Sequence, residues 1–268
     1  MRRRDFIAVL GGAAAMPLVA FAQPKNRPVV GVIRTTTPDD APTLLVPFNQ
    51  GLKEAGFAVG LNVDVEFRAE QRYERLASVV TELLNKPVDV IVATGAINAA
   101  LVAKAATQTV PIVFVIGSDP VETGLVKSLS HPGGNITGVT LFSSTLNAKR
   151  IELLREIVPG ASAFGLLINP DNPNSNREVK VLEQVALSGG WALHVTQASK
   201  DSDLNDAVAS LAKSGVGGFT HSVDVYLQTK HRELIDLSIK RRLPIVLGRR
   251  EAAVDGALVS FGSRPRDM

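Results

Sequence analysis

The sequence predicts an α/β fold of two doubly wound Rossmann-like lobes whose parallel sheets face a central cleft. Two observations lead to this prediction. Runs such as residues 90–93 and 110–117 are apolar without alternation, which is typical of parallel strands covered by helices on both faces. Strand-like and helix-like segments also alternate along the chain, and this alternation begins again near residue 145. Two arrays of this kind predict two similar lobes.

Residues 1–22 have the composition of a cleavable export signal. Three arginines at residues 2–4 precede an apolar stretch that ends in A-F-A at residues 20–22. This stretch is shorter than the ~20 residues that span a bilayer. The R-R-x-F-I pattern resembles the twin-arginine type of signal, although the general secretory route stays open. We therefore expect a mature chain that begins at Gln23 and lies in the periplasm.

We expect residues 23–141 to form the first lobe. Residues 63–67 alternate between polar and apolar side chains, which indicates a strand near a sheet edge. Residues 75–84 place their apolar side chains on one helical face, and residues 98–106 are nearly all small or aliphatic, so both segments are predicted as helices that pack on the sheet. The other expected elements are a helix that ends at Gly56 and strands at 29–33, 90–93, 110–117 and 136–140.

We expect residues 142–257 to form the second lobe. Residues 148–158 have the helical period and end at Pro159-Gly160, and residues 164–168 read as a buried strand. The elements expected after them are helices at 179–187, 204–211 and 227–239 and strands at 193–195, 218–223 and 245–247. Residues 258–268 are expected to cross between the lobes at the hinge.

The composition excludes several classes of protein. The chain has no cysteine and its four histidines share no metal-ligand spacing, so we expect no disulfide bond and no metal site. Three arginines and one aspartate at residues 2–5 supply two of the three net positive charges, and 5% aromatic residues offer no base-stacking surface, so we expect no nucleic-acid partner. No glycine-rich phosphate loop and no G-x-S-x-G motif occurs, so we expect no cofactor and no enzymatic activity.

Candidate ligand-binding residues lie on the loops that follow the predicted strands, because ligands of open α/β sheets bind at the carboxyl ends of the strands. Arg34 and Thr35 follow the first strand, and Thr94, Gly95 and Ala96 follow the third. The backbone N–H groups of this second loop suit one carboxylate, and a tight turn without a ligand is an equal alternative.

Further candidates follow the next strands. Ser118 and Asp119 come after residues 110–117, where Asp119 could bind a ligand ammonium or could cap the turn before Pro120. Arg34 could form a fork with a carboxylate, although a solvated arginine is the simpler interpretation. His221 is the histidine nearest to a strand end that should face the cleft.

Four motifs resemble those of bacterial ABC transporter substrate-binding proteins of the TrpX-like family. They are D-P-V-x-x-G-L-V at 119–126, P-G-G-N-x-T-G-V at 132–139, K-R-x-E-L-L-R-E-x-V-P at 149–159 and L-x-N-P-x-N-P at 167–173. The resemblance covers residues 29–262 and implies a type I periplasmic binding protein fold of the Leu/Ile/Val-receptor type. It also implies that Asn169 and Asn172 lie on a ligand-holding loop.

The resemblance implies an exported, monomeric receptor that captures an amino acid or similar small molecule and delivers it to an ABC permease in the inner membrane. A periplasmic sensory receptor that passes its closed form to a membrane sensor is the alternative. Members of this family usually continue well past an element matched by S-F-G at residues 260–262, whereas this sequence stops at Met268. We therefore expect a product truncated at its C-terminus.

Overall fold

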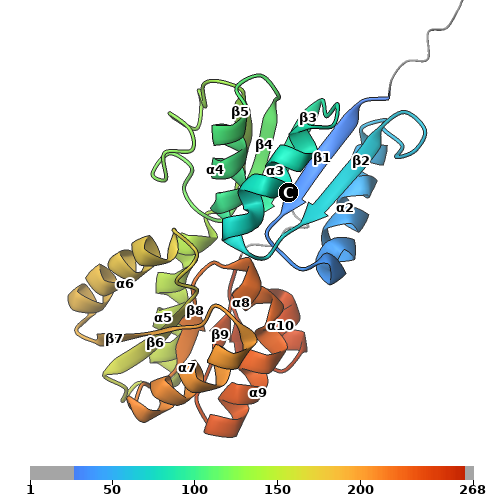
Figure 1. Cartoon of the computed structure of the whole chain (residues 1–268). Helices are drawn as coiled ribbons and strands as arrows, with labels where there is room; N and C mark the ends of the chain where they lie inside the picture. The colour runs from blue at the N-terminus through green and yellow to red at the C-terminus, as the bar shows by residue number, and fades with distance from the viewer. Residues whose placement is uncertain (1–26, 263–268) are drawn as a thin grey trace, which may run out of the picture.

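Both groups of predicted strands form parallel sheets in the computed structural model, which describes residues 27–262 (Figure 1). The first group builds the upper lobe of Figure 1 and the second group builds the lower lobe. The predicted export signal at residues 1–22 lies outside the described residues, and so does the end of the expected crossing segment. The predicted fold class, two α/β lobes with parallel sheets, is confirmed.

The first sheet has the strand order β2-β1-β3-β4-β5, and every neighbouring pair is parallel. The segment of alternating polarity, β2, lies at one edge of the sheet, as its pattern predicts. The strands are β1 (Val29–Arg34), β2 (Asp64–Ala69), β3 (Val90–Gly95), β4 (Ile112–Ile116) and β5 (Ile136–Thr140).

Helices cover the two faces of the first sheet unequally. On one face, α3 (Leu76–Leu84) and α4 (Ile97–Ala106) share a core cluster with the strands, and the buried alanines of α4 let it approach closely. On the other face, α2 (Ala41–Glu54) buries no residue completely, and its Leu44 and Phe48 pack over β1, β2 and β3.

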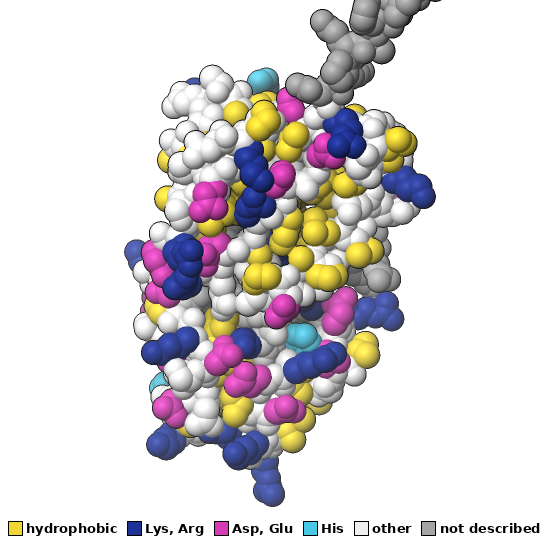
Figure 2. Space-filling view, turned by 45° about the vertical axis from the view of Figure 1, so that its right-hand side comes forward, with side chains coloured by type: hydrophobic (Ala, Val, Ile, Leu, Met, Phe, Trp, Pro, Cys, Tyr) yellow, Lys and Arg dark blue, Asp and Glu magenta, His cyan; other side chains and the backbone are white. Residues whose placement is uncertain are grey.

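The expectation of a sheet covered on both faces therefore holds only in part. Val115 of β4 is 37% exposed and Val139 of β5 is 49% exposed, because within residues 27–262 α2 does not extend over these strands. Figure 2 shows hydrophobic side chains gathered over the first lobe on the side that it draws, whereas charged side chains dominate the second lobe. Two short 3-10 helices, η1 (Pro38–Asp40) and η2 (Tyr73–Arg75), lie on loops of the first lobe.

The second lobe repeats the strand order of the first. Its strands β7, β6 and β8 form one parallel sheet, and β9 and β10 form a parallel pair that joins β8 through a bridge between Phe219 and Ile245. The order β7-β6-β8-β9-β10 thus corresponds to β2-β1-β3-β4-β5. The strands are β6 (Ala163–Ile168), β7 (Ala192–Gln197), β8 (Phe219–His221), β9 (Val246–Leu247) and β10 (Val259–Ser260).

The helices of the second lobe match the predicted ones with two differences. The helix expected at 227–239 is divided at Lys230 into two helices, and a short helix and a strand occupy parts of residues 250–260. The residues expected to begin the crossing between the lobes therefore open with β10 of the second lobe. The helices are η3 (Ser143–Thr145), α5 (Leu146–Ile157), α6 (Ser175–Gly189), α7 (Asp201–Lys213), α8 (Val225–Thr229), α9 (His231–Arg241) and α10 (Arg250–Val254).

The carboxyl ends of the two sets of strands face each other. The Tyr73 hydroxyl of the first lobe donates a 2.7 Å hydrogen bond to Asp224 of the second. Arg177 of α6 forms a 3.1 Å ion pair with Glu122, which follows β4. The chain passes from one lobe to the other between β5 and α5, where Phe142 adopts a left-handed backbone conformation with φ of 47°. Loops of both lobes therefore enclose one cleft.

Candidate ligand-binding cleft

All ten predicted site residues lie at the carboxyl ends of strands or on the loops that follow these ends. Each loop follows the carboxyl end of a strand, so the backbone turns that end the strands also position these side chains. The strands concerned are β1, β3, β4, β6 and β8. Four predicted residues end a strand, namely Arg34, Thr94, Gly95 and His221, and six lie on the loops that follow, namely Thr35, Ala96, Ser118, Asp119, Asn169 and Asn172.

Thr35 and the loop after β3 are in direct contact. The Ala96 N–H donates a 2.7 Å hydrogen bond to Thr35 Oγ1, and both residues are buried. A Cβ atom at Gly95 would lie 2.5 Å from Thr35 Oγ1 and 3.1 Å from Val225 of the opposite lobe. Gly95 also has a φ of +97°, which disfavours other residues. The loop after β3 is therefore a tight turn pressed between the lobes, with the Ala96 N–H bonded to the protein.

Arg34 is held by a neighbouring carboxylate. Its Nη2 and Nε lie 3.0 and 3.1 Å from Asp40 Oδ2. Burial lowers the pKa of Arg34, and the positive charge of Arg249 in the second lobe lowers it further, against the opposing effect of Asp40. Arg34 thus faces the cleft as a paired cation, with a second cation across from it.

Asp119 caps a turn in this conformation. Its Oδ1 accepts hydrogen bonds from the N–H groups of Val121 (2.8 Å) and Glu122 (3.1 Å), and the neighbouring Ser118 is buried. This is the geometry of the turn-capping alternative. The second carboxylate oxygen has room for a further donor because a carboxylate accepts several hydrogen bonds. Binding of a ligand ammonium by Asp119 stays a prediction.

Asp224 brings the two predicted asparagines together. Its Oδ2 accepts hydrogen bonds from Asn169 Nδ2 (3.2 Å), Asn172 Nδ2 (3.0 Å) and the Tyr73 hydroxyl (2.7 Å). Its Oδ1 caps α8 by accepting from the Leu227 N–H at 3.0 Å. Burial raises the pKa of Tyr73, and the charge of Asp224 raises it further. Sequence reasoning missed Asp224 and Tyr73, although an aspartate just before the first turn of a helix is a common cap.

A buried carboxylate lies behind this loop. Glu178 of α6 accepts hydrogen bonds from Asn147 Nδ2 (2.7 Å), Asn174 Nδ2 (2.8 Å) and the Val223 N–H (3.0 Å). Burial raises the pKa of Glu178 to about 7, although these donors and the charge of Arg150 act against the rise. This network fixes the strand end that leads to Asp224.

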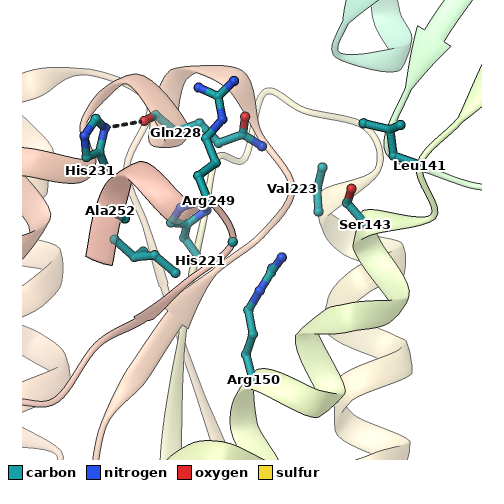
Figure 3. Close-up of a pocket in the computed structure, with 11 residues that line it drawn as sticks. Leu141, Ser143, Arg150, His221, Val223, Gln228, His231, Arg249 and Ala252 are labelled. Atoms are coloured by element: carbon teal, nitrogen blue, oxygen red, sulfur yellow. Dashed lines mark hydrogen bonds between the residues drawn. The ribbon is translucent and has the colours of Figure 1, made fainter. Parts of the chain in front are cut away.

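His221 lies apart from the other predicted residues, in a pocket of about 90 Å³ formed by the ends of β8 and β9 and the segment between the lobes (Figure 3). Its Nδ1 donates a 2.7 Å hydrogen bond to the Ser222 carbonyl oxygen. Burial lowers the pKa of His221 to about 4, so the ring is neutral near pH 7. The pocket is also lined by Arg150, Gln228 and Arg249, which sequence reasoning did not select.

A second hollow opens at the mouth of the cleft. It has a volume of about 440 Å³ and is lined by both lobes, with Tyr73 from the first and Asn169, Asp171 and Tyr226 from the second. Within residues 27–262, no group of three or more His, Asp or Glu side chains could hold a metal ion. None of the helices in that range has the length and apolar character needed to cross a membrane.

Two lobes of equal topology that close over a shared cleft define a bilobal ligand-binding protein. The model of the family described as "ABC transporter substrate binding protein" matches residues 30–268, so the chain belongs to this family. Its members are ligand-binding receptors of ABC transporters and not enzymes, which confirms the resemblance and the prediction of a non-enzymatic protein.

Relatives and solved structures agree with this assignment. The chain is 29% identical over 223 residues to the "Tyrosine-binding protein" of Clostridioides difficile, and the match covers 80% of this chain and 61% of that protein. It is similar to the ABC domain of Streptococcus pneumoniae in complex with L-Trp, with 21% identity, a TM-score of 0.79 and coverage of 90% of this chain and 80% of that one. A conserved domain protein of Vibrio cholerae gives 25% identity, a TM-score of 0.80 and coverage of 89% and 79%.

Proposed function

We propose that this chain captures an amino acid or a similar small molecule in the cleft between its lobes and delivers it to an ABC permease of the inner membrane. The observation that carries the proposal is the opposition of two sets of strand-end loops, joined across the cleft by the hydrogen bond between Tyr73 and Asp224. Loops from two lobes can enclose a ligand only if the ligand binds the closed form better than the open form.

The amino-acid class is supported by two kinds of observation. The relatives named above are described as binding tyrosine and L-Trp. The cleft itself offers both donors and acceptors, because Asp171 and Tyr226 line the hollow at its mouth while arginines line the inner pocket. A zwitterion needs both kinds of partner.

Periplasmic export and a monomeric state belong to the same proposal. The composition of residues 1–22 supports export, with residues 23–141 and 142–257 as the two lobes of the mature chain. Sequencing of the N-terminus of protein recovered from the periplasm should give Gln23 as the first residue. An intact N-terminus on that protein would contradict cleavage at this position.

The ligand can be identified directly. Protein purified without refolding is denatured, and the released small molecules are identified by mass spectrometry. We expect one amino acid or related compound in about equimolar amount, and titration calorimetry of the stripped protein with that compound should give one binding site per chain. Absence of a released compound, together with no heat signal from any of the twenty standard amino acids, would reject the amino-acid class.

A further inference from the structure

The pocket at the ends of β8 and β9 has an unusual polar lining. Within the described part of the chain, its polar side chains are two arginines, two histidines, a glutamine and a serine, and none is a carboxylate. Its volume of about 90 Å³ exceeds the ~10–15 Å³ that one water molecule needs. A buried site with several donors and no acidic side chain suits an anionic group.

Arg150 forms the base of this pocket and is held rigidly. Its Nε donates a 2.8 Å hydrogen bond to the Phe261 carbonyl oxygen, and its Nη1 donates to Asn147 Oδ1. Only 3% of the residue is exposed. A Cβ atom at position 248 would lie 2.5 Å from Arg150 Nη2, so Gly248 leaves the space that this guanidinium occupies. Figure 3 shows Arg150 directed toward the pocket from below.

Arg150 keeps its charge in this position. Burial lowers its pKa to about 10, which is still well above neutral pH. Glu178, the buried acid whose charge acts on Arg150, is already bonded to two asparagine amides and a backbone N–H. Asp255, beside the pocket residue His231, is bonded to that ring at 2.7 Å and to Arg232 at 3.2 Å. The acidic groups around the pocket therefore have partners of their own.

Arg249 supplies a second positive charge at the opening of the pocket. It is exposed and points toward the first lobe beside Gln228 (Figure 3). It lies close enough to Arg34 of the first lobe that its charge disfavours the charged form of Arg34. Closing the cleft thus brings two like charges from opposite lobes together, and an anion placed beside Arg249 would reduce this repulsion.

We propose that this pocket binds the carboxylate of the transported solute, with Arg249 as its ion-pair partner and Arg150 as a second cation beneath it. The inference rests on the proposed function, since it assigns one end of the ligand to one wall of the cleft. The ligand class is a carboxylic acid. A simple amine is repelled by the two guanidinium groups. The ammonium of an amino acid then lies away from this pocket.

Arg249→Gln tests the inference, and Arg250→Gln is the matched control. Both arginines are exposed neighbours, so each change removes one charge with little effect on folding, but only Arg249 lines the pocket. The probes are L-tyrosine and L-tryptophan, together with tyramine and tryptamine, which lack the carboxylate. Titration calorimetry measures the affinity of each protein for each probe, and the melting temperature of each ligand-free variant checks its fold.

We expect the unmodified protein to bind at least one of the two acids and neither amine. Arg249→Gln should weaken binding of that acid about 10- to 100-fold, as for loss of a hydrogen bond to a charged group, whereas Arg250→Gln should change it less than about twofold. Equal affinities of the two variants for the acid, or binding of the amines as tight as that of the acids, would overturn this inference alone. If no probe binds the unmodified protein, the aromatic amino-acid class fails and the inference fails with it.

Discussion

Asp224 links four partners through one carboxylate, and two of them lie on the loop after β6 while a third lies in the other lobe. Tyr73 and Asp224 are 151 positions apart in the sequence. No spacing rule connects such residues, so this contact could not be predicted from local pattern. Asn169 and Asn172 are found only because their motif resembles that of a known family. The rule that ligands bind at the carboxyl ends of parallel strands locates the loops. Which side chains of these loops bond to each other depends on the folded arrangement.

Glu178 is expected to make stability depend on pH. Burial raises its pKa from 4.5 to about 7, so between these pH values the folded chain holds a proton that the unfolded chain has released. The stabilisation is fully present below about pH 4.5 and is lost as the pH rises through about 7. Glu178→Gln removes this titration. The unfolding free energy of the original protein minus that of the variant should therefore fall by a few kcal/mol as the pH rises across this range.

Urea unfolding at several pH values measures this difference. The unfolding free energies of the original protein and its variants are compared at each pH. Burial lowers the pKa of His221 to about 4, which makes the stability of all these proteins rise with pH over an overlapping range, and the comparison cancels this effect. Glu183→Gln, an exposed position on the same helix, serves as the control and should give a curve parallel to that of the original protein. A parallel curve for Glu178→Gln would refute the elevated pKa.

Some helices and strands have a clear hydrophobic pattern in the sequence, and others do not. Long apolar runs and one-sided helices, such as β6 and α3, are predicted close to their observed bounds. The strands β9 and β10 have two residues each, which is too short for any period to be visible. The division between α8 and α9 at Lys230 also carries no break in the apolar pattern, so periodicity alone predicts one continuous helix.

The turn between β3 and α4 requires glycine for two separate reasons, and a pair of variants separates them. Gly124 shares the positive φ of Gly95, but beyond its chain neighbours no atom lies within 4 Å of where its Cβ would be, so Gly124→Ala tests backbone strain alone. We expect Gly124→Ala to cost about 1–2 kcal/mol of unfolding free energy. Gly95→Ala should cost about 1–3 kcal/mol more, because its Cβ would collide with Thr35 Oγ1 and crowd Val225. Equal costs in urea unfolding would contradict this close contact.

At the scale of the whole molecule, few polar contacts join the lobes among residues 27–262, and these should determine how far the cleft closes. Tyr73→Phe removes the hydrogen bond to Asp224, which as a bond to a charged group is worth about 1.5–3 kcal/mol. The ligand-free variant should therefore shift toward an open form, with a larger radius of gyration in small-angle X-ray scattering. Glu122→Gln removes the exposed ion pair with Arg177, which contributes only about 0–1 kcal/mol, and should leave the radius unchanged. An unchanged radius for Tyr73→Phe would show that other contacts hold the lobes together.

The repeated strand order places the apolar clusters on either side of the cleft in separate lobes, and the loops that border the cleft contribute little to them. Most of the apolar side chains that keep the chain folded thus lie away from the loops where the proposed ligand would bind. Under the proposed function, ligand preference would change by substitution at the loop tips while both lobes retain their architecture. A receptor organised in this manner can diversify rapidly across a family without redesign of its scaffold.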